Sequence, residues 1–283
     1  MMIDKDKSSK LKIIGNSNNN DQDKFLSTAA TLQHNKKEKF STGSTYLDAI
    51  LGGGIESGSI TQIYGASGSG KSQICFTTCV LLPIKYSSIY VDTEGKVRIE
   101  RIKQIAEKRG IESDNLLKNI YISQPTNSQE MEITIDHISD FSSLNNNNNI
   151  KLLIVDSLIN PYRVEYQGRS KLPERQQKIS LLMSKIRKLA NEKKVAVIIT
   201  NHIQTDPISS YSFNNEMPVG GNILKFSSTH IVSLKKYRNN THACLIQSNW
   251  LPYHESYFIV TEKGIENERY KDKKGERKLK KCL

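Results

Sequence analysis

The chain has 283 residues and a mass of 32.1 kDa, with a net charge of +12 and a pI near 9.4. It contains no apolar run near the roughly 18 residues of a membrane span, and its N-terminus lacks a signal peptide's apolar segment. We therefore expect an intracellular protein, cytoplasmic in a prokaryote or nuclear in a eukaryote, with no membrane partner and with a charge that favours nucleic acid.

The two ends of the chain differ from its middle. Residues 1–39 are mostly polar and indicate a disordered or linker segment, whereas residues 40–268 carry the patterns of a folded core. Residues 269–283 form a basic tail, in which residues 269–281 hold eight Lys or Arg against two acids. This tail is either a solubilising disordered segment or an arm that binds phosphate nonspecifically. The asparagine run at 145–149 predicts a surface loop.

Strand and helix signals alternate along the core. Apolar runs at 59–65, 87–92, 151–156 and 195–200 predict strands buried on both faces, as in a parallel sheet. Helical spacing of apolar residues occurs at 98–110, through Ile99, Ile102 and Ile105, and again at 175–194. Three further strands with short turns follow residue 228 and are expected to be antiparallel. The predicted fold class is α/β: a mainly parallel sheet with helices on both faces and a β-rich antiparallel C-terminal edge.

A phosphate-binding motif follows the first of these strands. "GASGSGKS" satisfies G-x-x-x-x-G-K-[ST], with a strand before it and a helical run after it. Its glycines let backbone N–H groups close around phosphate oxygens, and the helix N-terminus adds positive potential. The lysine would reach the β- and γ-phosphates, and the last serine would supply a hydroxyl to Mg²⁺. We therefore predict ATP and Mg²⁺ as ligands of the loop residues Gly65, Ala66, Ser67, Gly68, Ser69, Gly70, Lys71 and Ser72.

Two acids at strand ends are candidates to complete this site. Asp156 ends the buried run "KLLIVD", at the sheet edge where open α/β proteins bind ligands, and would hold the metal through its water shell. Glu94 follows the strand "IYVD" and would polarise the attacking water. We prefer Glu94 to Asp92 because Asp92 still lies within the strand.

The stretch "PYRVEYQGRSK", residues 161–171, follows the strand of Asp156. It is either a solvated loop or a contact surface for an anion. Arg163 and Arg169 could each neutralise a phosphate, and Gly168 would let the chain turn between them. Tyr162 and Tyr166 could stack on bases or pack the base of the loop; for Tyr162 we favour packing.

The cysteines are sparse: Cys75, Cys79, Cys244 and Cys282 include no Cys-x-x-Cys pair. Cys75 and Cys79 share one helical face, where small buried thiols are a more common role than metal binding. The pattern suits a reducing compartment.

Several ordered motifs together resemble the ATPase core of the RadA recombinases, the archaeal and eukaryotic branch of the RecA family. They include "STGSTYLDAILGGGIESGSITQIYGASGSGKSQIC", "IYVDTEGKVRIERI", "LLIVDSLINPYRVEYQGRSKLPERQQ", "VAVIITNHIQ" and "PVGGNIL". The resemblance covers residues 40–268 and implies a P-loop ATPase of RecA type. It also implies ATP-dependent binding of single-stranded DNA, nucleoprotein filaments and strand exchange in homologous recombination.

The resemblance also assigns roles by position. It implies that residues 65–72 bind ATP, that Asp156 supports the metal, that Glu94 activates water and that Arg101 stacks on the adenine. The family's two DNA loops would be residues 158–172 and 203–219, the second continuing into Gly220 and Gly221. Within the first, Arg163 and Arg169 occupy the family's phosphate-contacting positions.

The chain departs from the family pattern at four places. His202 replaces a glutamine thought to sense the γ-phosphate; it could still donate a hydrogen bond, or it could be structural. The segment "QSNWLP", 247–252, lacks the acid of the family's ATP cap. The polar residues 1–39 do not resemble the family's N-terminal helix-hairpin-helix domain. The family's Phe-x-x-Ala oligomerisation peptide is matched loosely by Phe25–Ala29, with one residue too many.

These departures leave two main functional hypotheses. The first, towards which we lean, is a RadB-like recombinase paralogue or mediator, a DNA-dependent ATPase that hydrolyses ATP slowly beside another RecA-family recombinase. The second is the strand-exchange recombinase itself, forming homo-oligomeric filaments on single-stranded DNA. A signalling ATPase similar to KaiC is a third hypothesis, disfavoured by the match at residues 161–177.

Overall fold

The computed structural model describes residues 37–144, 149–205, 216–271 and 277–279. The peptide at Phe25–Ala29 and most of the asparagine run lie outside the described residues. No described helix is both long enough and apolar enough to cross a membrane.

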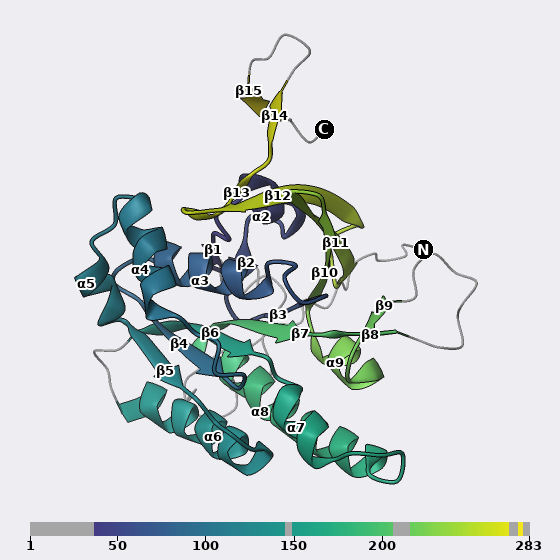
Figure 1. The fold of residues 1–283 in the computed structure, drawn as a ribbon. Coiled ribbons are helices and arrows are strands. Elements are labelled where there is room, and N and C mark those ends of the chain that lie inside the picture. The colour runs from purple at the N-terminus through teal and green to yellow at the C-terminus, as the bar shows by residue number, and fades with distance from the viewer. Residues whose placement is uncertain (1–36, 145–148, 206–215, 272–276, 280–283) are drawn as a thin grey trace, which may run out of the picture. The chain divides into compact units, whose positions relative to one another are not determined.

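A nine-stranded sheet organises the protein, with the strand order β13-β12-β11-β10-β3-β7-β6-β4-β5 (Figure 1). The four apolar runs predicted as parallel strands are β3 (Ile60–Gly65), β4 (Ser87–Asp92), β6 (Ile150–Asp156) and β7 (Ala196–Asn201). They pair in parallel, and every residue of β3, β4 and β7 is buried, which explains their continuous apolar character. The parallel part is completed by β5 (Ile120–Ser123) and β10 (His230–Tyr237).

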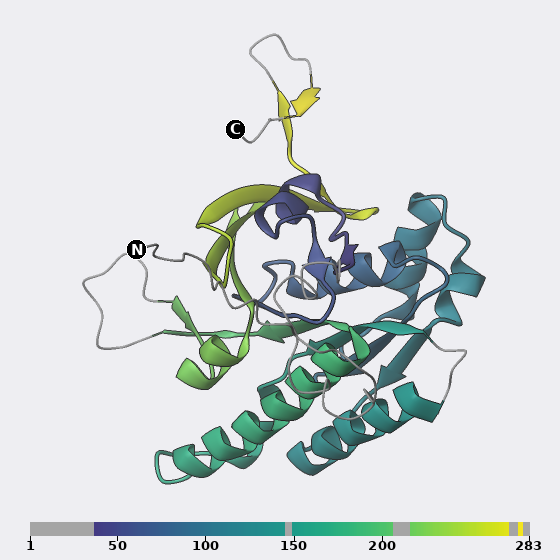
Figure 2. The same ribbon diagram turned by 180° about the vertical axis from the view of Figure 1, so that it is seen from behind.

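The C-terminal edge is antiparallel, as predicted. It consists of β11 (Asn240–Ser248), β12 (His254–Thr261) and β13 (Gly264–Asn267). The prediction needs one refinement, because β10 is antiparallel to β11 but parallel to β3. This edge curls over the helices α2 and α3 (Figures 1 and 2).

Helices cover both faces of the sheet, as predicted (Figures 1 and 2). One face and its apolar cluster include α2 (Thr45–Ile50), α3 (Lys71–Leu81), α4 (Ile99–Lys108) and α5 (Ser113–Leu117). The other is covered by α6 (Ser128–Leu144), α7 (Asn160–Glu165), α8 (Leu172–Lys193) and α9 (Gly221–Ser227). Short strand pairs are added by β1 (Lys39–Phe40) with β2 (Ile55–Glu56), β8 (Ile203–Thr205) with β9 (Glu216–Pro218), and β14 (Arg269–Lys271) with β15 (Arg277–Leu279).

The helix predicted at 98–110 is confirmed as α4. Ile102 and Ile105 are fully buried, whereas Ile99 is 38% exposed at the first position of the helix. One expectation needs correction. The segment 158–172 is not a simple loop, since α7 lies within it. Pro161 is preorganised for a first helical turn, and Tyr162 has no exposed surface and packs in the apolar cluster. This burial agrees with our prediction that Tyr162 packs the base of the segment rather than stacking on bases.

Candidate nucleotide site and arginine-lined cavity

The phosphate-loop motif joins the end of β3 to the start of α3. Gly70 has φ 100° at the N-cap of α3, and Gly68 has φ 76°, a left-handed conformation that favours glycine. Lys71 Nζ donates to the carbonyl oxygens of Gly65 (2.8 Å) and Ala66 (2.9 Å). Burial lowers the pKa of Lys71, against the opposing charges of Asp156 and Glu94. The loop thus presents a helix N-terminus and a buried cation, a combination suited to phosphate.

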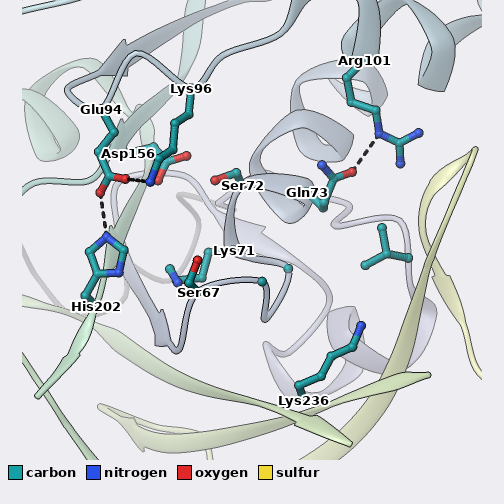
Figure 3. A pocket seen from close by; sticks show the side chains of 13 residues that line it. Ser67, Lys71, Ser72, Gln73, Glu94, Lys96, Arg101, Asp156, His202 and Lys236 are labelled. Atoms are coloured by element: carbon teal, nitrogen blue, oxygen red, sulfur yellow. Dashed lines mark hydrogen bonds and ion pairs between the residues drawn. The ribbon is translucent and has the colours of Figure 1, made fainter. Parts of the chain in front are cut away.

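A cavity of about 530 Å³ opens in front of this loop (Figure 3). Most of the predicted nucleotide residues line it: Ser67, Gly68, Gly70, Lys71, Ser72, Glu94, Arg101, Asp156 and His202. Gly65, Ala66 and Ser69 belong to the loop but are not lining residues. The site also contains four residues that no sequence motif singled out: Gln73, Lys96, Lys236 and Val260.

Asp156 is held firmly at the end of β6. Its Oδ2 accepts a hydrogen bond of 2.5 Å from the Tyr90 hydroxyl, and its Oδ1 accepts one from the Thr200 hydroxyl. Burial raises the pKa of Tyr90 well above its usual range, so this hydroxyl remains a donor. Together with the Ser72 hydroxyl, the oriented carboxylate provides the oxygen ligands that Mg²⁺ prefers.

Asp92 and Glu94, separated by a single residue, have different tasks. Asp92 is buried and accepts backbone N–H bonds from Glu94, Lys96 and Val97 at 3.2, 3.1 and 2.9 Å. It therefore fixes the loop that follows β4. Glu94 instead faces the cavity from that loop, beside His202 (Figure 3).

Glu94 has three hydrogen-bond donors around its carboxylate. Its Oε1 lies 2.7 Å from His202 Nε2 and accepts a 2.9 Å bond from the Ser157 hydroxyl, while its Oε2 contacts Lys96 Nζ. The His202 hydrogen bond is the main cause that holds the pKa of Glu94 well below its usual range, with Lys96 and Ser157 adding to it. The Glu94 carboxylate is consequently ionised at neutral pH and occupied on both oxygens.

Arg101 lies at the opposite rim of the cavity, on α4. Its Nε donates to Gln73 Oε1 at 2.9 Å, and its Nη2 donates to the Thr261 carbonyl at 2.5 Å. These contacts connect α4 to α3 and to the end of β12. A flat guanidinium held in this way can pack against a planar base.

A second cavity, of about 490 Å³, lies beside α7 and the start of α8. It is lined by Arg163, Gly168, Arg169, Leu172, Arg175, Ile203 and Val219. Gly168 has φ 81°, as its predicted turning role requires. None of the three guanidinium groups has a hydrogen bond or ion pair to a residue in the described part of the chain. Arg175 was not among the predicted site residues. The one pattern in the sequence that could have indicated it is its position one helical turn after the basic residue Lys171.

Gly220 and Gly221 do not line either cavity. They begin α9 with φ angles of 97° and 60°. A Cβ at Gly220 would lie 2.9 Å from Ile159 Cδ1, so this glycine permits the start of α9 to pack closely against Ile159. The contact of Gly220 and Gly221 with DNA stays a prediction.

Comparison with known proteins agrees with these features. The Rad51 family matches residues 33–268. The "DNA repair and recombination protein RadA" of Methanococcus maripaludis strain S2 is 38% identical over 247 residues, which are 81% of this chain and 76% of that protein. The protein of the same name from Methanococcus voltae is 36% identical over the same shares of both chains. The chain therefore belongs to the Rad51 family and has its RecA-type α/β fold.

Proposed function

We propose that this protein is an ATP-hydrolysing, DNA-binding member of the family that acts in homologous recombination and DNA repair. One observation carries the proposal: Lys71, Ser72, Glu94 and Asp156, from three separate segments, converge on one cavity at the carboxyl edge of the parallel strands. The cavity therefore contains the residues proposed to hold the phosphates, the metal ion and the attacking water. The names of the RadA relatives support recombination and repair as the process.

The residues divide the work as follows. Lys71 and the backbone N–H groups of the loop hold the phosphates, and Arg101 holds the base. Ser72 and Asp156 hold Mg²⁺, which when bound neutralises charge developing on the phosphate oxygens. Glu94 orients the attacking water. Because its pKa is low, Glu94 is a weak proton acceptor, so we expect orientation to contribute more than proton abstraction.

DNA binds at the arginine-lined cavity in this proposal. Arg163, Arg169 and Arg175 concentrate positive charge without an acidic partner among the described residues, and such charge is stabilised by an external anion such as a DNA phosphate. Val219 lines this cavity and its N–H donates to the His202 carbonyl at 3.0 Å, while the His202 side chain contacts Glu94. His202 thus has a contact towards each cavity, and we assign it the position of the family's glutamine.

We favour the role of paralogue or mediator over that of the strand-exchange recombinase. The Glu94–His202–Lys96 contacts occupy both oxygens of the proposed water-orienting group, which favours slow hydrolysis. The turn between β11 and β12, residues 249–253, also contains no acid to complete a neighbouring subunit's site. The partner would be another copy of this chain or another RecA-family recombinase.

A paired assay separates the two roles. Strand exchange on single-stranded DNA is measured with ATP, first with this protein alone and then beside a full-length recombinase. Stimulation of the recombinase, with little exchange by the protein alone, supports the mediator role; efficient exchange alone assigns the recombinase role instead. Lys71→Ala provides the control, since it should abolish ATP binding and every ATP-dependent effect. If Lys71→Ala binds a fluorescent ATP analogue as tightly as wild type, the nucleotide site itself is misassigned.

A further inference from the structure

Three potential metal ligands meet on the outer face of the antiparallel edge. Along β11, Ala243 and Leu245 face the apolar core, so His242 and Cys244 share the opposite face. The register pairs Cys244 with Glu255 on β12, which brings the carboxylate to the same face. The cluster His242–Cys244–Glu255 is separate from the nucleotide cavity, because none of the three lines it.

The spacing of the three ligand atoms is that of a coordination sphere. His242 Nε2 lies 3.0 Å from Glu255 Oε2 and 3.4 Å from Cys244 Sγ, and Cys244 Sγ lies 4.0 Å from Glu255 Oε2. Tetrahedral zinc with Zn–N and Zn–O bonds near 2.0 Å and Zn–S near 2.3 Å needs separations of about 3.3 Å for N···O and about 3.6 Å for the two involving sulfur. Each observed separation is within about 0.5 Å of that value, so small side-chain rotations suffice.

Neighbouring aromatic residues orient two of the ligands. The Tyr257 ring stacks on His242 with centroids 4.6 Å apart and an interplanar angle of 21°. The Tyr253 hydroxyl donates to Glu255 Oε2 at 3.2 Å. Cys244 is 9% exposed, His242 is half-buried and Glu255 is open to solvent, which leaves one side of the cluster accessible to an ion. Second partners of this kind commonly fix the ring and carboxylate orientation at metal centres.

We propose that His242, Cys244 and Glu255 bind a divalent transition-metal ion of the zinc type, with water in the fourth position. A thiolate and an imidazole select zinc over magnesium or calcium, which prefer oxygen ligands alone. The ion joins β11 to β12 beside the turn at residues 249–253. Its role is structural: it fixes this edge of the sheet, independently of the proposed ATP and DNA sites.

Cobalt(II) substitution tests the site in the full chain. The Cys282→Ser background removes the C-terminal thiol, and Cys75 and Cys79 are fully buried, so a thiolate-to-cobalt charge-transfer band reports Cys244. We expect one equivalent of cobalt to give this band together with the visible bands of four-coordinate cobalt, and zinc to displace it. Cobalt in the nucleotide cavity would give no thiolate band, because no cysteine is among the described residues that line it.

Variants assign the ligands. Cys244→Ser should remove the charge-transfer band, and His242→Ala or Glu255→Gln should weaken cobalt binding by at least about 10-fold. His254→Ala is the matched control, since this exposed histidine neighbours Glu255 but is outside the cluster; it should bind like the background protein. Zinc at about 100 times its Kd should raise Tm by about 5–10 °C in the background protein and not in Cys244→Ser. A missing band, or a band that persists in Cys244→Ser, overturns the proposal; Glu255→Gln keeps the test valid where Cys244→Ser does not fold.

Discussion

The two cavities differ in whether their charged side chains have hydrogen-bond partners within the protein. In the nucleotide cavity, Lys71, Glu94 and Asp156 are already hydrogen-bonded within the protein. In the arginine-lined cavity, the guanidinium groups of Arg163 and Arg169 have no partner among the residues that the structure describes. Both cavities are polar. Among the described residues, positive charge without an internal partner is concentrated in the second cavity, whereas in the first it is confined to Lys236.

This difference has an energetic meaning. A ligand entering the nucleotide cavity must replace existing contacts, such as those of Lys71 with the carbonyls of Gly65 and Ala66, so its binding exchanges hydrogen bonds. An anion entering the other cavity replaces only water and counterions, and its binding should depend strongly on salt. Substitutions should therefore change catalysis at one site and salt dependence at the other.

The largest expected effect is that of Glu94→Gln. The amide keeps the size of the side chain but loses the charge that orients water. Because proton abstraction contributes little here, we expect the ATP hydrolysis rate to fall by about 10²-fold, the lower end of the range for acid–base catalysis, while ATP binding remains. Single-turnover hydrolysis and equilibrium binding of a fluorescent analogue measure the two quantities. Glu192→Gln, which changes an exposed carboxylate on α8, is the matched control and should hydrolyse ATP normally. Wild-type hydrolysis by Glu94→Gln would remove Glu94 from the proposed site.

The second effect concerns Arg163→Ala/Arg169→Ala. Each lost phosphate contact should reduce the magnitude of the negative slope of log K against log salt by about 0.7 for single-stranded DNA, or about 1.4 for the pair. The double variant should also bind about 25-fold more weakly at about 0.1 M salt. Fluorescence anisotropy across a salt series measures both. Arg187→Ala/Arg238→Ala removes the same charge from exposed positions outside this cavity, and should leave the slope nearly unchanged. Equal slopes in the two double variants would show that Arg163 and Arg169 do not contact DNA and that residues 161–171 are an ordinary solvated segment.

How much of this was predictable from sequence depends on the range of the interactions. Strand positions, the phosphate loop and Asp156 follow from local patterns, because a buried strand ending in an acid and a glycine-rich turn are visible in a few residues. The Glu94–His202 contact joins residues 108 positions apart, and the cluster of His242, Cys244 and Glu255 depends on the register of β11 with β12. A pattern of a few neighbouring residues does not specify the order or the register of the strands. These contacts could therefore not be predicted from the sequence and were found only in the structure.

The third prediction tests the contact between His202 and Glu94. Because the folded-state pKa of Glu94 is depressed, its stabilising contribution is present above the unfolded value of about 4.5 and is lost as pH falls through the folded pKa. His202→Ala removes the largest cause of this depression and should destabilise the protein by about 1 kcal/mol above pH 4.5, since Lys96 and Ser157 remain as donors.

Urea unfolding between about pH 3 and 7 measures this difference. It should stay constant above about pH 4.5 and shrink only as pH falls through the folded-state pKa of Glu94 in the variant, which Lys96 and Ser157 still hold below 4.5. His202→Gln is the conservative variant: its amide can still donate to Glu94 and should recover most of the lost stability. A difference between wild type and His202→Ala that grows on acidification would show that the contact does not stabilise the ionised carboxylate.

The smallest expected effect, Tyr162→Phe, tests whether the arginine-lined cavity is shaped by packing. The Tyr162 ring is fully buried and lies 6.4 Å from the Tyr166 ring, but its hydroxyl has no hydrogen-bond partner among the described residues. Removing an unsatisfied buried hydroxyl should leave the free energy of unfolding unchanged or raise it by up to about 1 kcal/mol, with no change in DNA affinity. Tyr162→Ala should instead cost about 3–5 kcal/mol through the cavity it creates, and should weaken DNA binding by releasing α7. Loss of DNA affinity in Tyr162→Phe, measured at unchanged stability, would instead place the hydroxyl in contact with DNA and contradict a packing role.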